Sequence, residues 1–109
     1  MIKRKRTKKE EAMQILSNVP DDKVFWASNG AVLKNLNDLA QALQNMNLDH
    51  YKNHVSYEKN DFCNWLNVVV KDDILAKELI HARNKESALR KVNERIETLK
   101  GMLPKNAKG

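Results

Sequence analysis

Short apolar stripes at helical spacing follow one another along this chain, and each begins just after an Asn, Asp or Thr residue. These side chains accept hydrogen bonds from the first free N–H groups of a helix, so they mark helix starts. With 3 Gly and 2 Pro in 109 residues, the chain has little material for the tight turns of an all-β fold. The pattern predicts a mainly α, small single-domain helical fold.

About six helical segments are expected from this spacing. The first begins at Thr7, which has the spacing of a capping box with Glu10, and its apolar pattern ends at Pro20. The last and longest begins after Asn84 and ends near Gly101. The helix starts expected between them are at Asn35, at Asn47 or Asp49, at Asn60 or Asp61, and at Asp72 or Asp73.

Residues 24–33 depart from the helical pattern. Two short apolar runs flank Asn29 and Gly30, a pair that tolerates the positive φ angles of a type I′ turn. We expect one short β-hairpin near residues 24–33, with helices covering one face, because so short a hairpin is marginal in water. Trp26 is predicted to lie in the core because its neighbours are apolar. Tyr57 is left open, as a core residue or as an exposed platform on which nucleic-acid bases stack.

One domain accounts for the length of the chain. We expect residues 1–6 to form a disordered basic arm, residues 7–103 a single helical domain, and residues 104–109 a short basic tail. No apolar run reaches the ~18–20 residues that span a bilayer, and Glu10 and Glu11 follow the basic start, which argues against a signal peptide. A single Cys excludes an intramolecular disulfide and fits a reducing compartment. These features favour a cytoplasmic location, with nucleoid or ribonucleoprotein association.

The net charge of +6 lies entirely in the first nine residues, and beyond Lys9 the chain carries 14 Lys and Arg against 14 Asp and Glu. The cations of this first segment are Lys3, Arg4, Lys5, Arg6, Lys8 and Lys9. Such a cluster is typical of segments that contact nucleic-acid phosphates, and it has no Asn, Gln or aromatic side chain to read base edges. We expect a nucleic-acid partner, DNA or RNA, and no membrane. The alternative is that the segment only keeps the protein soluble or touches acidic surfaces.

The last predicted helix carries a second candidate surface. Its apolar residues alternate spacings of three and four, the heptad pattern of a coiled-coil seam. These residues are Leu89, Val92, Ile96, Leu99 and Leu103. Two heptads are short for a free-standing coiled coil, so the helix either packs on the core of its own domain or forms a dimer seam or docking edge for a partner helix. The alternative function is therefore a protein-interaction or dimerisation module.

Few residues offer the convergent polar groups that catalysis needs. His50 and His54 share one helical face, but a zinc site needs three or four ligands and the chain has a single Cys. Cys63 lies on an apolar, aromatic-rich helix face, which favours a buried and inert thiol. The sequence predicts no enzyme, no metal and no cofactor. For His54, we expect a hydrogen bond to Asp61 across the loop between them.

The segment from residue 24 to about residue 79 contains four short elements in a fixed order. An aromatic start with a turn glycine and a Leu-x-x-Leu helix comes first, and a Tyr/His element follows. An Asn-Asp-Phe-x-x-Trp element and an acidic turn before a Leu-Ala helix complete the series. The residues that carry these elements are Phe25, Gly30, Leu36, Leu39, Leu43, Tyr51, His54, Val55, Asn60, Asp61, Phe62, Trp65, Asp72, Leu75 and Ala76.

In these elements the chain resembles an uncharacterised family of small helical domains found in archaea and some bacteria. The Asn-Asp-Phe-x-x-Trp element is the specific part of the resemblance, and the leucine helix alone is not specific. The family has no assigned activity, so the resemblance implies a domain boundary and names no function. Its members commonly have Ala at the position of Cys63, which implies that this thiol is not catalytic. The basic arm lies outside the resemblance.

Overall fold

The computed structural model describes residues 7–82 and 84–103. This part is mainly helical, as the sequence predicts, with one two-stranded antiparallel hairpin. The described elements are α1 (Lys8–Leu16), the 3₁₀-helix η1 (Asp21–Lys23), β1 (Phe25–Trp26), β2 (Val32–Leu33), α2 (Leu36–Asn45), α3 (Leu48–His54), α4 (Asp61–Trp65), the π-helix η2 (Leu66–Val70), α5 (Asp73–Ile80) and α6 (Lys85–Gly101). The arm predicted for residues 1–6 and the tail predicted for residues 104–109 lie outside the described residues.

Side-chain caps start all the described α-helices at the predicted positions. Each capping side chain accepts a hydrogen bond from the backbone N–H three residues further on. Such caps satisfy N–H groups that have no partner within the helix. The capping residues are Thr7, Asn35, Asn47, Asn60, Asp72 and Asn84.

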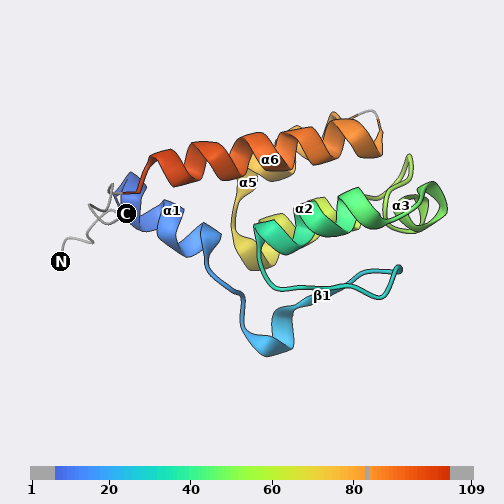
Figure 1. Cartoon of the computed structure of the whole chain (residues 1–109), viewed down its shortest axis with the longest axis horizontal. Helices are drawn as coiled ribbons and strands as arrows, with labels where there is room; N and C mark the ends of the chain where they lie inside the picture. Colours follow the sequence, from blue (N-terminus) through green and yellow to red (C-terminus); the bar gives the residue numbers. More distant parts are fainter. Residues whose placement is uncertain (1–6, 83, 104–109) are drawn as a thin grey trace.

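The longest helix, α6, runs along one edge of the domain and packs against α1, α2 and α5 (Figure 1). The hairpin lies on the other side of α2, which contacts both α6 and β2 (Figure 1). The buried apolar side chains form one core between these elements, and its largest fully buried member is Phe62. Among the described helices, none combines the length and the apolar character that crossing a bilayer requires.

The turn of the hairpin is longer than the predicted type I′ turn. Backbone hydrogen bonds of 2.9 Å join the N–H of Ala27 to the carbonyl of Ala31 and the N–H of Gly30 to the carbonyl of Ala27, which leaves three residues in the loop. Within this turn only Gly30 has a positive φ, of +93°, whereas a type I′ turn needs two such residues. The side chain of Asn29 instead accepts a hydrogen bond from the N–H of Ala31 at 3.1 Å. The prediction of a two-residue turn is therefore wrong.

The helix expected after Asn60 changes form midway. α4 continues as the π-helix η2, and the chain then turns at Lys71, whose φ of 67° lies in the left-handed region. The N–H of Asp72 closes this turn by bonding to the carbonyl of Leu66 at 2.8 Å. A π-helix and a left-handed Lys are both uncommon and need support from surrounding contacts. Together they bring Asp72 into the core.

Asp72 is 1% exposed and forms an ion pair with Arg95 of α6. The Nε of Arg95 donates to Oδ2 of Asp72 at 2.9 Å, and Nη2 donates to Oδ1 at 3.1 Å. Oδ1 also accepts the N–H of Leu75 at 3.1 Å and so caps α5. One carboxylate therefore joins the start of α5 to α6.

Replacing Arg95 with Ala should lower the free energy of unfolding by about 3–5 kcal/mol, because the buried carboxylate of Asp72 loses its cation. Urea denaturation followed by circular dichroism measures this change. The control is Arg90→Ala, at an exposed position of the same helix, where a change within about 0.5 kcal/mol is expected. Equal effects of the two substitutions would contradict the role assigned to the ion pair.

Candidate nucleic-acid interface

The start of α1 is fixed immediately after the basic arm. The hydroxyl of Thr7 accepts the N–H of Glu10 at 3.1 Å, and the carboxylate of Glu10 accepts the N–H of Thr7 at 3.0 Å. Lys8 and Lys9 occupy the first turn of the helix, and both are exposed. The other predicted phosphate contacts, Lys3, Arg4, Lys5 and Arg6, lie outside the described residues.

Lys8 and Lys9 are not placed where cations stabilise a helix. The N-terminus of a helix carries partial positive charge, so basic side chains there are disfavoured and acidic ones are favoured. Glu10 and Glu11, in the same turn, supply the favourable charge. The two lysines thus oppose the helix dipole while their ammonium groups stay accessible to an anionic ligand.

The start of α1 lies beside the end of α6 (Figure 1). Lys100, in the last turn of α6, is exposed and has Glu97 at 4.0 Å. The sequence continues from this end into Lys105 and Lys108, which lie outside the described residues. Both basic terminal segments therefore adjoin the same end of the helical domain.

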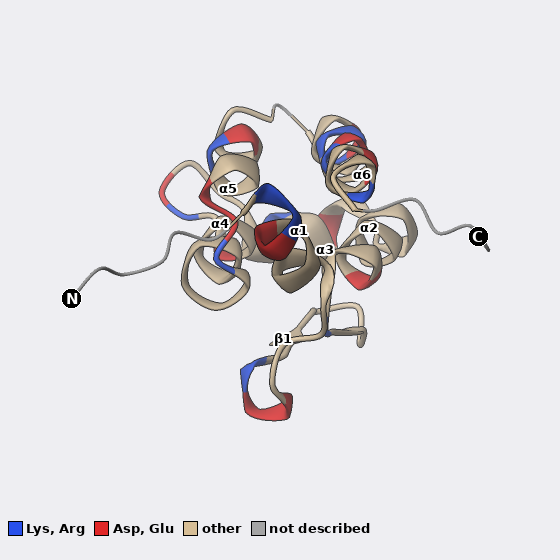
Figure 2. Ribbon diagram, turned by 90° about the vertical axis from the view of Figure 1, so that its left-hand side faces the viewer, with Lys and Arg blue, Asp and Glu red and all other residues tan. Residues whose placement is uncertain are grey.

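The helical domain itself is electrically balanced. Residues 1–6 contain four of the twenty Lys and Arg, residues 104–109 contain two, and the fourteen that remain match the fourteen Asp and Glu. In Figure 2, basic and acidic residues alternate over the helices without forming a field of one sign. When Lys8 and Lys9 are counted with the domain, the net charge of +6 equals the charge of the two terminal segments.

The predicted seam of α6 is not an open surface. Val92, Ile96 and Leu99 are buried, and Leu89 and Leu103 pack against the same core while remaining partly exposed. The helices that cover them belong to this chain, since α6 packs on α1, α2 and α5. The heptad pattern reflects internal packing of a long helix, so a dimer or partner seam made of these residues would require the domain to open.

His54 holds the hairpin onto the helices. Its Nδ1 lies 3.1 Å from Oδ2 of Asp61, and its Nε2 accepts the N–H of Ser28 at 2.9 Å. Because Nε2 accepts this hydrogen bond, the proton of the neutral imidazole lies on Nδ1, which donates a hydrogen bond to the carboxylate of Asp61. The rings of Phe25 and Phe62 lie 5.0 and 5.1 Å from the imidazole. The predicted hydrogen bond between His54 and Asp61 is confirmed.

The hydroxyl of Ser28 and the imidazole of His54 do not bond to each other. A nucleophilic serine needs its hydroxyl within reach of the imidazole, but here the backbone N–H of Ser28 occupies Nε2 of His54 while the hydroxyl donates to the carbonyl of His50 at 3.2 Å. The second histidine, His50, is half-buried. Within residues 7–82 and 84–103, no group of three or more His, Cys, Asp and Glu side chains has a metal-binding arrangement.

Cys63 is buried, and its Sγ lies 3.2 Å from the carbonyl of Ala76, to which it donates. Burial raises the pKa of this thiol to about 11. A nucleophilic cysteine requires the opposite shift, toward the thiolate at neutral pH. The environment of Cys63 therefore makes it an inert core residue.

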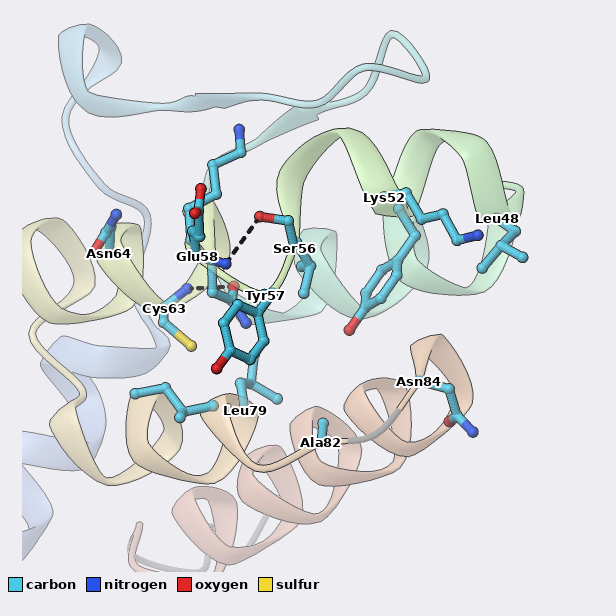
Figure 3. Close-up of a pocket in the computed structure, with 15 residues that line it drawn as sticks. Leu48, Lys52, Ser56, Tyr57, Glu58, Cys63, Asn64, Leu79, Ala82 and Asn84 are labelled. Atoms are coloured by element: carbon cyan, nitrogen blue, oxygen red, sulfur yellow. Dashed lines mark hydrogen bonds between the residues drawn. The ribbon is translucent and has the colours of Figure 1, made fainter.

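A groove of about 710 Å³ lies between α3, the loop that follows it and the end of α5 (Figure 3). Leu48, Leu79 and Ile80 give it apolar walls, and Tyr57 extends over it from the loop (Figure 3). The sequence left open whether Tyr57 is a core residue or an exposed one, and its side chain is fully exposed. The charged side chains along the groove have both signs, so it offers no basic track for a phosphate backbone. The groove is lined by Leu48, Tyr51, Lys52, Val55, Ser56, Tyr57, Glu58, Lys59, Asn60, Cys63, Asn64, Leu79, Ile80, Ala82 and Asn84.

The prediction that Trp26 lies in the core is wrong, since its side chain is 73% exposed. Successive residues of a strand point to opposite faces of a sheet, and helices cover only one face of this hairpin. Phe25 takes the inward position, where its ring stacks on Phe62 at 5.1 Å. The period-two alternation of the strand could have shown that Phe25 and Trp26 do not both face the core, but only the packing of Phe25 shows which of them faces outward.

In comparisons with known proteins, no family model, no curated protein and no solved structure matches this chain. The resemblance to a family of small helical domains stays a prediction. The interpretation of the interface therefore depends on the geometry and the charges of the chain itself.

Asp61→Asn should lower the melting temperature by a few degrees at neutral pH. Burial acts to raise the pKa of Asp61, but hydrogen bonds from His54 and Lys59 outweigh it and hold the pKa below its ordinary value of 3.8. A lowered pKa in the folded state gives stability that is present above the ordinary pKa and is lost as the pH falls through the folded pKa. The difference between the two proteins should therefore disappear in strong acid. Thermal melts between about pH 7 and pH 2 measure it, with the exposed Glu58→Gln as the control.

Cys63 should react slowly with iodoacetamide in the folded protein. A pKa of about 11 in place of 9.0 lowers the thiolate fraction at neutral pH by about a hundredfold, and burial restricts access further. Alkylation followed by mass spectrometry, with and without urea, measures the ratio of the two rates. Equal rates would show that the thiol is accessible in the native state.

Proposed function

We propose that this protein is a non-catalytic, nucleic-acid-associated protein of the chromatin or ribonucleoprotein kind. Its basic terminal segments contact phosphates independently of sequence, and the start of α1 and the end of α6, from which they continue, lie at one end of the helical domain. The principal contacts are Lys3, Arg4, Lys5, Arg6, Lys8 and Lys9. A cytoplasmic location at the nucleoid or in ribonucleoprotein particles belongs to the same proposal.

The observation that carries this proposal is the separation of charge from the folded domain. A protein that needs charge only for solubility can spread it over the surface, where unlike charges also stabilise each other. Here the fold is neutral and the excess lies in two sequence segments that adjoin the start of α1 and the end of α6. Such clustering places cations close together, as phosphates are along a nucleic-acid strand.

The first turn of α1 supports the same conclusion. Lys8 and Lys9 are disfavoured there by the helix dipole, and the capping box of Thr7 and Glu10 fixes the helix without them. Their presence is explained if they bind an anionic ligand. The chemistry of the candidate catalytic residues gives no comparable support to an enzyme, because the thiol of Cys63 is protonated and the imidazole of His54 is used by the hairpin.

The test is binding to labelled duplex DNA and to structured RNA across a salt series. If all six cations of the first nine residues contact duplex phosphates, the slope of log K against log salt should be about −5, so affinity falls about a thousandfold from ~50 to ~200 mM. Neutralising the four cations of residues 3–6 to Gln should reduce the slope to about −2. The DNA and RNA series together identify the polymer.

A matched control changes four cations of the domain to Gln. Lys52, Lys71, Lys77 and Arg90 are exposed, and their side chains make no ion pair among the described residues. This variant has the same net charge as the arm variant but keeps the arm, so its slope should stay near that of the unchanged protein. Equal slopes for the two variants, or no binding by the unchanged protein, would falsify the proposal.

A further inference from the structure

The outer face of the hairpin presents an aromatic side chain that nothing in the described part of the chain covers. Trp26 is 73% exposed and pairs across the hairpin with Val32, which is half-buried. The other tryptophan, Trp65, is 6% exposed and lies in the core. The chain thus uses one indole for packing and leaves the other in water, although its burial would be strongly favourable.

The backbone beside Trp26 is held in place by contacts between the hairpin and the helices. On the inner face, Phe25 stacks on Phe62 and meets the ring of Trp65 edge-on at 5.8 Å. The indole N–H of Trp65 donates to the carbonyl of Lys23 at 2.9 Å. These contacts fix the chain just before Trp26, and the hydrogen bond from the N–H of Ser28 to His54 fixes it just after. The ring of Trp26 can therefore receive a planar ligand at a small cost in conformational entropy.

Two exposed cations lie close to Trp26 along the chain and are placed to contact phosphates on either side of a stacked base. Lys23 lies at the end of η1 and Lys34 directly follows β2, and both are exposed without an ion pair among the described residues. Lys34 is two residues beyond Val32, which places it on the same face of the extended chain as Trp26. Figure 2 shows the hairpin and η1 at one edge of the domain, away from the dense helical packing. Asp21 and Asp22 also lie in η1, and they oppose a phosphate there.

We propose that Trp26 is a stacking platform for a base of single-stranded nucleic acid, with Lys23 and Lys34 contacting the flanking phosphates. This inference rests on the proposed function and names the form of the polymer. In a duplex the faces of the bases are already stacked on each other, whereas a single strand exposes them to aromatic side chains. A flat indole with cations beside it recognises that exposed face without reading sequence.

The experiment uses the full chain, about 20-nucleotide oligo(dT) and oligo(U), and a duplex of the same length at ~50 mM salt. Trp26→Ala should weaken single-strand binding by about ten- to a hundredfold and leave duplex binding unchanged, because one base–aromatic contact is lost. Trp26→Phe should retain most of the affinity. The variant Tyr57→Ala removes an even more exposed aromatic ring from another part of the surface and should have no effect.

Tryptophan fluorescence gives a second measurement, and unfolding of a variant would not produce the same result. A stacked base quenches an indole, so oligo(dT) should quench the emission of the unchanged protein. The quenching should vanish in Trp26→Phe, while binding measured by anisotropy persists.

The double variant Asp21→Asn with Asp22→Asn should tighten single-strand binding, since two charges that repel phosphate are removed. Unchanged emission on binding, or equal losses from Trp26→Ala and Tyr57→Ala, overturns the inference. If duplex binding stays steeply dependent on salt in that case, the proposed function survives it; if neither polymer binds, both proposals fail.

Discussion

The buried ion pair between Asp72 and Arg95 sets the position of the longest helix. Removing two charges from water is costly, and here two hydrogen bonds between them and the cap on Leu75 offset that cost. The pair joins the start of α5 to α6, and α6 in turn packs against α1 and α2. The end of α6 therefore lies beside the start of α1 because of an interaction in the core. The positions from which the two basic segments continue therefore depend on a charge pair in the core.

A second set of contacts makes the hairpin possible. Two strands of two residues each bury too little surface to be stable alone. Their support comes from directed hydrogen bonds, in which His54 accepts the N–H of Ser28 and Trp65 donates to the carbonyl of Lys23. These contacts involve only the inner face and the tip of the hairpin, so its outer face is not needed to hold the hairpin on the domain. Trp26 can be exposed without weakening the attachment of the hairpin.

The helix starts could be predicted from the sequence because capping is local. Asn35 and Asn84 accept hydrogen bonds from residues three positions away, so a short window contains the whole interaction. The partners Asp72 and Arg95 are 23 positions apart, and their pairing depends on a π-helix and on the left-handed conformation of Lys71. The spacing of residues within a short window predicts neither the π-helix nor the left-handed conformation of Lys71. The heptad pattern of α6 was visible in the sequence, but only the packing of the other helices shows that the domain itself covers it.

The division between a neutral domain and basic ends separates two kinds of binding. At physiological ionic strength, charges more than about 8 Å apart in water are largely screened, so the arm attracts phosphate only where the strand passes close to it. That contribution falls steeply with salt because bound counterions are released. Stacking on Trp26 involves no ion exchange and depends little on salt. A strand bound by both contacts should therefore keep a residual affinity at salt concentrations where the arm alone no longer binds. This residual affinity tolerates any base sequence, and it comes from Trp26 in the domain rather than from the charged ends.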